Sequence, residues 1–215
     1  ARSIKNAVKF LLQRIYTPSR FMWRLPAAQA SVALTFDDGP DPVYTPAVLD
    51  LLAAHRIKAT FFMIGEKVQQ YPDLVRRMTA EGHGVGGHTW SHREIVGLPQ
   101  PELISELERC RQIIRDASGI DSMLFRPPRG RVDLGSIHRV CKLGYCLVHW
   151  TKTYSDYQRD GIEPLMNRFR QDAPAARDIV LLHDHNEHTV AALNVLIPQW
   201  QAKGIAFSKI SGGDS

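Results

Sequence analysis

The chain has 215 residues, of which 44% are hydrophobic and 23% are charged, fractions that are ordinary for a globular protein. They exclude a disordered tail, a collagen-like fibre and a coiled coil, while the length favours one domain with at most an appendage. The net charge of +5 is compatible with an anionic surface or polymer, but it is not by itself a nucleic-acid signature.

The first thirty residues differ from the rest of the chain. Apolar residues recur at helical spacing between lysines and arginines, at Ile4, Val8, Leu11, Leu12 and Ile15. This pattern predicts a basic amphipathic helix followed by a linker over residues 1–30. Such a helix either makes peripheral contact with an anionic membrane surface or packs on the outside of the domain.

From Ser31 onward, short apolar runs alternate with longer amphipathic segments. We predict strands at Val32–Phe36, Ala59–Ile64, Gly84–Gly87, Ser122–Phe125, Tyr145–Trp150, Ile179–His183 and Ile205–Lys209. Helices are predicted at Thr45–His55, Lys67–Glu81, Pro101–Ala117, Leu134–Leu143, Ile162–Gln171 and Thr189–Lys203. Strands that alternate with crossover helices predict a parallel α/β sheet. Because residues 31–215 are few for a closed barrel, we expect a distorted or incomplete ring.

Polar residues gather where the predicted strands end. Asp37 and Asp38 end an apolar strand before a Gly-Pro turn, where both carboxylates can reach one pocket; an Asp-rich turn without chemistry is the alternative. His88 and His92 are spaced i, i+4, which in a helical turn places two imidazoles side by side. With Asp38 they would hold one divalent ion and leave positions open for water and substrate, unless they are two unrelated histidines.

Three further segments lie at later strand ends. Arg126 opens a stiff Arg-Pro-Pro-Arg-Gly loop that could position an arginine or a backbone N–H. Asp156 lies in a segment that by itself indicates a plain loop, and His183 ends a buried strand, where a lone histidine is usually a core residue. Because the carboxyl ends of parallel strands share one face of a barrel, we expect these segments to meet in one site.

The ordered set of motifs resembles the polysaccharide deacetylase family, also called the NodB homology or carbohydrate esterase family 4. The motifs are TFDDG at 35–39, HTWSH at 88–92, RPPRG at 126–130 and LLHD at 181–184. The resemblance extends from about Ser31 to about Ser208. It implies an α/β fold, a deformed (β/α) barrel of about seven parallel strands, in a NodB homology domain over 31–215. It also implies a metal-dependent hydrolase that removes acetyl groups, above all N-acetyl groups, from an amino-sugar glycan and releases acetate.

The resemblance implies a role for each motif residue. Asp37 would be the general base, oriented by Arg126, and His183 would be the general acid, held and charged by Asp156. The metal ligands would be Asp38, His88 and His92. The substrate-binding candidates are Arg129, whose backbone N–H would stabilise the oxyanion, Leu181 beside the acetyl methyl, Tyr157 and Trp90.

The chain departs from the family pattern in two motifs. The third motif usually carries Tyr where this chain has Arg129. A further family motif, which lies between RPPRG and LLHD at 153–157 here, usually reads DxxDW, whereas in this chain Thr153 replaces the first Asp and Tyr157 replaces the Trp. Both changes alter the side chains that border the sugar groove.

The implied cofactor is one divalent metal ion, zinc in the first place, with Co²⁺, Mn²⁺ or Ni²⁺ as alternatives, because such a ligand set selects ions by geometry and supply. The expected partner is an N-acetylated oligo- or polysaccharide: a chitin oligomer, peptidoglycan, an exopolysaccharide or a lipid-linked sugar. Two other functions stay open, hydrolysis of another non-peptide C–N bond in a cyclic amide or ureide, and carbohydrate binding without catalysis. We expect His185 and His188 to be exposed at the barrel rim, with a second metal site as the alternative.

The three cysteines, Cys110, Cys141 and Cys146, include no CxxC pair and lie in apolar segments. This arrangement predicts buried free thiols rather than a disulfide framework. Free thiols and the lack of a signal peptide in the chain as given favour the cytoplasm, whereas the family resemblance favours the cell envelope. Because the sequence starts at Ala1, a leader could have been removed upstream.

Overall fold

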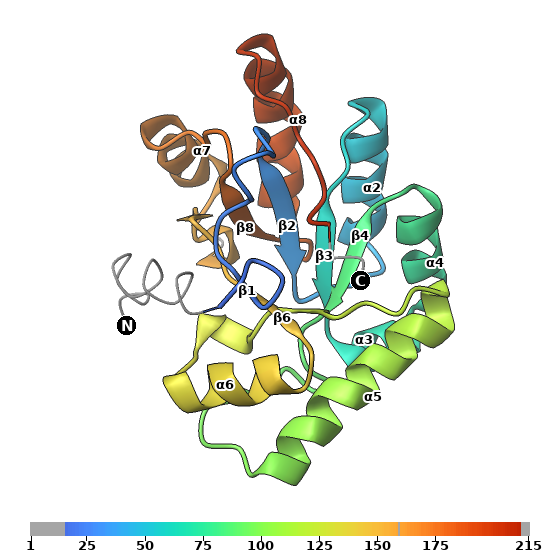
Figure 1. The fold of residues 1–215 in the computed structure, drawn as a ribbon. Coiled ribbons are helices and arrows are strands. Elements are labelled where there is room, and N and C mark those ends of the chain that lie inside the picture. Colours follow the sequence, from blue (N-terminus) through green and yellow to red (C-terminus); the bar gives the residue numbers. More distant parts are fainter. Residues whose placement is uncertain (1–15, 159, 212–215) are drawn as a thin grey trace.

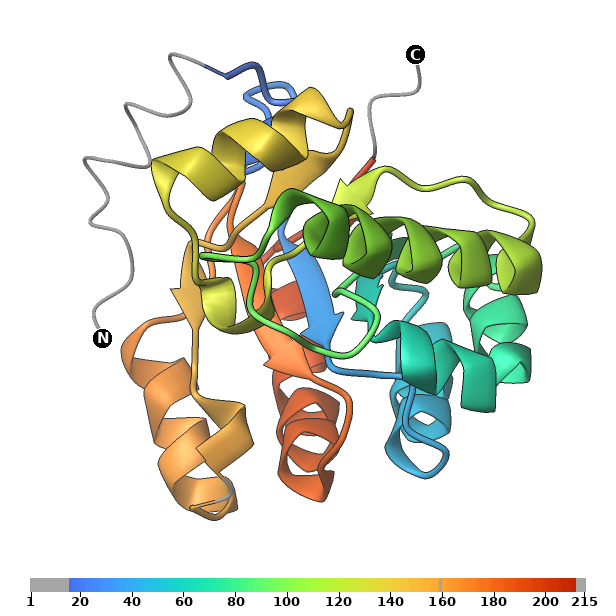
Figure 2. The same cartoon turned by 90° about the horizontal axis from the view of Figure 1, so that it is seen from below.

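The computed structural model describes residues 16–158 and 160–211, which form one parallel sheet wrapped on its outside by helices (Figures 1 and 2). The strand order is β1-β6-β5-β4-β3-β2-β8-β7. The strands are β1 Phe21–Met22, β2 Ala33–Asp37, β3 Thr60–Met63, β4 Gly84–Gly87, β5 Leu124–Phe125, β6 Cys146–Val148, β7 Lys152–Thr153 and β8 Ile179–His183. No pairing joins β1 to β7 in the described part of the chain. The predicted incomplete ring of parallel strands is confirmed.

Seven α-helices and two 3₁₀ turns connect the described strands. The helices are α2 Tyr44–Ala54, α3 Gly65–Gln70, α4 Pro72–Ala80, α5 Gln100–Ser118, α6 Leu134–Lys142, α7 Ile162–Gln171 and α8 Glu187–Ala202. The 3₁₀ turns are η1 Pro128–Gly130 and η2 Asp156–Gln158. The single helix predicted over 67–81 is wrong, because Tyr71 leaves the helical region (φ −131°, ψ 55°) just before Pro72. A residue before proline is disfavoured in the helical conformation, so the segment divides into α3 and α4.

The central strands β2 and β8 are buried along their whole length. They are nearly continuous apolar runs because the helices cover one face and the opposite wall of the ring covers the other. The ring of Phe36 on β2 stacks on that of Phe61 on β3, with 5.1 Å between the centroids. Long α5 adds a stripe of buried residues at helical spacing, Leu103, Leu107, Cys110 and Ile114. This packing fixes the strand ends that carry the motifs.

Three elements differ from the sequence prediction. Strand β1 lies in the segment predicted as a linker, and pairs Phe21 with Leu147 of β6; the helical pattern before it lies outside the described residues. Strand β7 was not predicted. The strand predicted over 205–209 is wrong, because only Phe207 makes a bridge, to Val32, and the chain then leaves the sheet.

The sequence-based prediction about the cysteines can be compared with the structure. Cys110, Cys141 and Cys146 are buried and free, as predicted. Burial raises the pKa of the Cys110 and Cys146 thiols to about 12, and that of Cys141 to about 11, which makes them unreactive. No described helix combines the length and the apolar character that crossing a bilayer requires.

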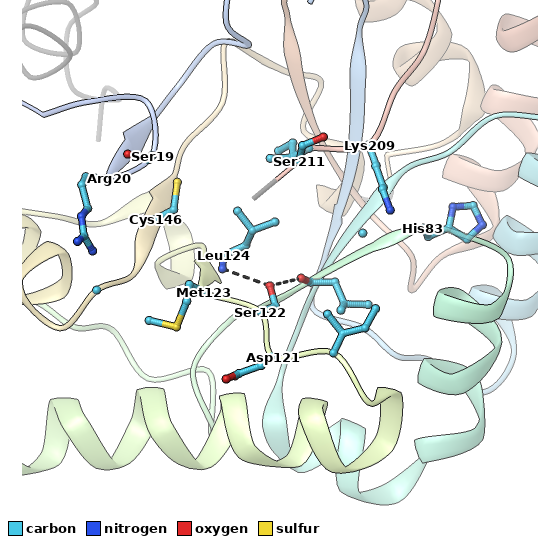
Figure 3. Close-up of a pocket in the computed structure, with 15 residues that line it drawn as sticks. Ser19, Arg20, His83, Asp121, Ser122, Met123, Leu124, Cys146, Lys209 and Ser211 are labelled. Atoms are coloured by element: carbon cyan, nitrogen blue, oxygen red, sulfur yellow. Dashed lines mark hydrogen bonds between the residues drawn. The ribbon is translucent and has the colours of Figure 1, made fainter. Parts of the chain in front are cut away.

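A cavity of about 630 Å³ opens at the amino ends of β4, β5 and β6 (Figure 3). There, the Ser122 hydroxyl donates to the Val85 carbonyl at 2.6 Å and accepts from the Leu124 N–H at 3.2 Å. The side chain thus links two strands where their backbones have separated. Arg20, Lys209 and buried His83 also border this cavity. It lies at the end of the sheet opposite the sequence motifs.

Candidate active site

A second cavity, of about 560 Å³, lies at the carboxyl ends of the strands. Its lining is Asp37, Asp38, His88, His92, Arg129, Gly130, His149, Trp150, Thr153, Ser155, Tyr157, Leu181, His183 and His185. Buried Arg126 and Asp156 stand behind the wall, each bonded to a lining residue. All five motif segments therefore meet here, as expected for the carboxyl face of a barrel.

Asp38, His88 and His92 converge on one point. Asp38 Oδ1 is 3.3 Å from His88 Nε2 and 3.1 Å from His92 Nε2, and one ligand atom from each residue lies within 4.8 Å of the others. Burial by itself would raise the pKa of Asp38, but in the metal-free protein His88, His92 and His183, when they are protonated, hold this pKa well below its usual range. Elsewhere in residues 16–158 and 160–211, no other group of three potential ligands is arranged in this way.

These three residues fit a divalent cation. His88 Nδ1 lies 2.7 Å from the Arg126 carbonyl, and because a carbonyl can only accept, Nδ1 carries the hydrogen and Nε2 presents a lone pair to Asp38. Asp38 Oδ1 is buried, and no residue in the described part of the chain donates a hydrogen bond to it in good geometry. A lone pair facing an orphaned carboxylate oxygen is the arrangement that a metal ion completes.

The segment of the two histidines is not the helical turn predicted from their spacing. Residues 88–92 form a bend, with Thr89 (φ 64°) and His92 (φ 61°) in the left-handed region. The imidazole centroids of His88 and His92 still lie 5.1 Å apart. The pair that the spacing indicated is therefore present, on an irregular backbone.

Asp37 is oriented by a buried arginine. Arg126 has no exposed surface, and its NH1 donates to Asp37 Oδ1 and to Thr35 Oγ1, both at 2.7 Å. Its guanidinium carbon lies 4.2 Å from the centre of the Phe62 ring, and its NH2 donates to the His149 carbonyl at 3.3 Å. Since Arg126 occupies Oδ1, Asp37 Oδ2 is the oxygen that faces the metal ligands, 3.9 Å from His88 Nε2.

His183, which pairs with Asp37 across β2 and β8, forms a buried pair with Asp156. His183 Nδ1 lies 2.9 Å from Asp156 Oδ1, while Asp156 Oδ2 accepts from the His183 backbone N–H and from the Thr189 hydroxyl, each at 2.8 Å. Burial lowers the pKa of His183, but the hydrogen bond and charge of Asp156 outweigh it and raise this pKa to about 9. His183 Nε2 points to the cavity, 4.0 Å from Asp38 Oδ2.

A sequence model of the polysaccharide deacetylase family matches residues 24–148, more than half of the chain. The chain belongs to the polysaccharide deacetylase family. It is 35% identical to a peptidoglycan-N-acetylglucosamine deacetylase of Bacillus cereus over 207 residues, covering 94% of this chain and 96% of that protein. It is 36% identical to a chitooligosaccharide deacetylase of Sinorhizobium fredii over 188 residues, covering 81% and 87%.

The fold of this deacetylase agrees with a solved relative. A peptidoglycan N-acetylglucosamine deacetylase, crystallised with 4-naphthalen-1-yl-N-oxidanyl-benzamide, superimposes with a TM-score of 0.84 and 29% identity, covering 92% of this chain and 94% of that one. The family, the deformed barrel and the class of enzyme predicted from the motifs are therefore confirmed.

Not every predicted residue of the deacetylase lies where it was expected. Trp90 does not line the cavity: its ring packs under the Arg109 guanidinium at 4.0 Å and against Gly65, so its role as a substrate contact stays a prediction. His185, expected at an exposed rim, is half-buried in the cavity with its ring centroid 5.2 Å from that of His183. His188, also half-buried, lies in the first turn of α8.

The remaining predicted substrate contacts of the deacetylase do line the cavity. Leu181 forms part of its wall, and exposed Tyr157 presents its ring edge-on to His183 at 5.6 Å between centroids. Arg129 has a left-handed backbone (φ 56°), and its side chain extends into solvent to pair with Glu94 at 3.1 Å. The side chain that replaces the usual Tyr is thus directed to the surface, while its peptide borders the cavity.

Several functional neighbours escaped the sequence analysis. Thr35 accepts a hydrogen bond from Arg126 and also donates to the Val180 carbonyl at 2.6 Å, so it links the arginine that orients Asp37 to the neighbouring strand β8. His149 stacks on Trp150 at 4.2 Å, and its Nε2 lies 3.3 Å from the Gly130 carbonyl. The sequence carried only a weak signal for these two roles. Thr35 lies inside the first motif, and His149 lies near the end of a predicted strand.

Proposed function

We propose that this chain is a zinc-dependent N-deacetylase that releases acetate from N-acetylated amino-sugar residues of a glycan. The observation that supports this most strongly is the convergence of Asp38, His88 and His92 on one point, with Asp37 Oδ2 3.9 Å from His88 Nε2 and His183 Nε2 4.0 Å from Asp38 Oδ2. The named activities of the relatives, on peptidoglycan and on chitooligosaccharides, favour N-acetylglucosamine as the sugar.

Asp38, His88 and His92 would hold the metal through one carboxylate oxygen and two Nε2 atoms. When bound, the ion would polarise the acetyl carbonyl and lower the pKa of a nearby water, which an unactivated amide requires. His88 is prepared for this role because the Arg126 carbonyl already fixes its tautomer.

Asp37 serves as the general base. Its Oδ1 is held by Arg126, so Oδ2 remains available to take a proton from the attacking water. The salt bridge keeps the carboxylate in one orientation inside a buried wall. Thr35 and the Phe62 ring fix the guanidinium in turn, so the base cannot rotate away from the cavity.

His183 serves as the general acid. With a pKa of about 9 it is protonated at neutral pH, and its Nε2–H can be delivered to the amine as the C–N bond breaks. The Arg129 backbone N–H would stabilise the oxyanion, a contribution often near 3 kcal/mol per donor. Leu181 would pack against the acetyl methyl in the cavity wall.

The test is acetate release from N-acetylglucosamine oligomers by the full chain. We expect activity that a chelator abolishes and added Zn²⁺ restores, and that His92→Ala loses. His138→Ala, a matched change at an exposed histidine on α6, is expected to leave activity unchanged. Release of no acetate from any N-acetylated glycan in the presence of Zn²⁺, with hydrolysis of a cyclic ureide instead, would overturn the proposal.

A further inference from the structure

The turn that carries the metal carboxylate is held on one side by a lysine. Asp38 has a left-handed backbone (φ 72°), and its carbonyl accepts a hydrogen bond from Lys67 Nζ at 2.7 Å. Lys67 is half-buried in α3, where the N–H of Ile64, the residue before the helix, donates to the Gly39 carbonyl at 3.0 Å. A charge-assisted hydrogen bond to the carbonyl fixes the plane of the Asp38–Gly39 peptide.

The same turn rests on a second, fully buried group. The Asp184 carboxylate packs against Gly39 so closely that a Cβ built there would stand 2.8 Å from Asp184 Cγ and nearer still to both oxygens. Gly39 does not have a left-handed φ, so its need to be glycine is steric and comes from Asp184. Thr45 Oγ1 donates to Asp184 Oδ2 and accepts from the Asp41 N–H at 2.8 Å.

Asp184 also follows His183 directly in the chain, at the end of β8. The carboxylate that supports the Asp38–Gly39 turn is therefore covalently joined to the general acid. Its other oxygen, Oδ1, is buried without a hydrogen-bond partner in the described part of the chain. This buried carboxylate therefore supports the turn mainly by packing against Gly39, and not through a full set of hydrogen bonds.

We propose that Lys67 and Asp184 are positioning residues that hold the Asp38–Gly39 turn from two sides and thereby set the affinity of the site for its metal. Neither residue touches the point where Asp38, His88 and His92 converge. Lys67 acts through the Asp38 carbonyl and Asp184 through Gly39, the residue that follows Asp38, as outer partners of metal sites do. The inference rests on the metal site of the proposed function.

The first test is a calorimetric titration of the metal-free full chain with Zn²⁺ alone. Lys67→Met keeps the length of the side chain but removes the donor, and we expect a dissociation constant about 10- to 100-fold higher. Lys67→Arg should restore most of the affinity. Lys58→Met, at an exposed lysine whose side chain lies beside Gly82 near the amino end of β4, is the matched control and should bind Zn²⁺ like the wild type.

Thermal unfolding of the metal-free proteins separates positioning from general stability. We expect the unfolding midpoint of metal-free Lys67→Met to equal that of the wild type. A Zn²⁺ affinity unchanged in Lys67→Met, or an affinity that falls only together with the midpoint, overturns the inference. If the wild type itself binds no Zn²⁺, it is the metal site of the proposed function that fails.

A double-variant cycle tests the contact between Gly39 and Asp184. Gly39→Ala should weaken Zn²⁺ binding, because the new methyl overlaps the carboxylate. Removing the carboxylate with Asp184→Ala makes room for that methyl, so the double variant should bind Zn²⁺ no more weakly than Gly39→Ala alone. If the fold-loss of Zn²⁺ affinity in the double variant equals the product of the losses in the two single variants, the two residues are not coupled and the inference is wrong.

Discussion

Replacing Asp156 by Asn tests the general acid most directly, because the change removes one charge and keeps the shape. In the native protein, Asp156 Oδ2 accepts two hydrogen bonds and Oδ1 accepts one, from His183 Nδ1. An asparagine can keep its oxygen where the His183 backbone N–H and the Thr189 hydroxyl donate. Its NH₂ group then faces His183 Nδ1 and favours the neutral imidazole, whose Nδ1 accepts.

The size of the effect follows from the raised pKa of His183. That pKa lies at about 9 against 6.5 for an unperturbed histidine, a difference of about 2.5 pH units. One unit corresponds to about 1.4 kcal/mol, so the native environment favours the imidazolium by about 3 kcal/mol. Because the burial that lowers this pKa remains in Asp156→Asn, we expect the pKa of His183 to fall to about 6.5 or below.

The assay is kcat/KM for acetate release as a function of pH. A general acid must be protonated, so the alkaline limb of the wild-type profile should fall near the pKa of His183, and the limb of Asp156→Asn should lie about 2.5 units lower. The metal-free wild type should also lose stability as pH rises from about 6.5 through about 9, since its raised pKa stabilises the fold only while His183 is protonated. An alkaline limb at the same pH in both proteins would refute the reasoning.

Three further variants test the rest of the site. Asp37→Asn should lower turnover by about 10²- to 10⁴-fold while calorimetry shows Zn²⁺ binding retained, and full activity would remove Asp37 from the role of base. Arg126→Met leaves Asp37 as a buried charge without its partner, so urea denaturation should show the unfolding free energy reduced by about 3–5 kcal/mol. Gly130→Ala would place a methyl against the Trp150 ring at a left-handed position (φ 62°) and displace the Arg129 peptide. We expect kcat/KM to fall about 100-fold with Zn²⁺ affinity unchanged, and an unchanged kcat/KM would contradict the oxyanion role.

The sequence was sufficient to find the residues that meet in the candidate site because strand ends are visible in it. An apolar run that stops at Asp37 or at His183 marks the carboxyl end of a buried strand. Parallel topology then brings such ends together, whatever the separation along the chain. Asp37 on β2 is the direct register partner of His183 on β8, as parallel topology predicts for two strand ends.

Other features were not predictable because they depend on contacts across the fold. Two-residue strands such as β1 and β7 are too short to show any periodicity. The role of Thr35 depends on Arg126, which lies 91 residues further along the chain. Trp90 stands in sequence between His88 and His92, the two proposed ligand histidines, yet the left-handed backbone at Thr89 accompanies a bend that packs its ring against α5.

Backbone conformation at the site also lay beyond sequence reasoning. Of the seven described residues other than glycine with positive φ, five border the cavity or its loops: Asp38, Thr89, His92, Arg129 and Ser155. Such conformations are costly for a residue with a side chain and persist only where the surroundings impose them. The sequence motifs identify the residues of the loops, but they do not indicate that several of these residues adopt left-handed backbone conformations.

The two ends of the unclosed ring bear on how the enzyme behaves at high concentration. A long unpaired strand at the border of a sheet offers a row of amide groups to which a second molecule can add. Here the bordering strands, Phe21–Met22 and Lys152–Thr153, are two residues each, and one of them carries a lysine. Such short edge strands offer few unpaired backbone N–H and C=O groups to a strand of a second molecule. The sheet can therefore remain an open ring without promoting aggregation.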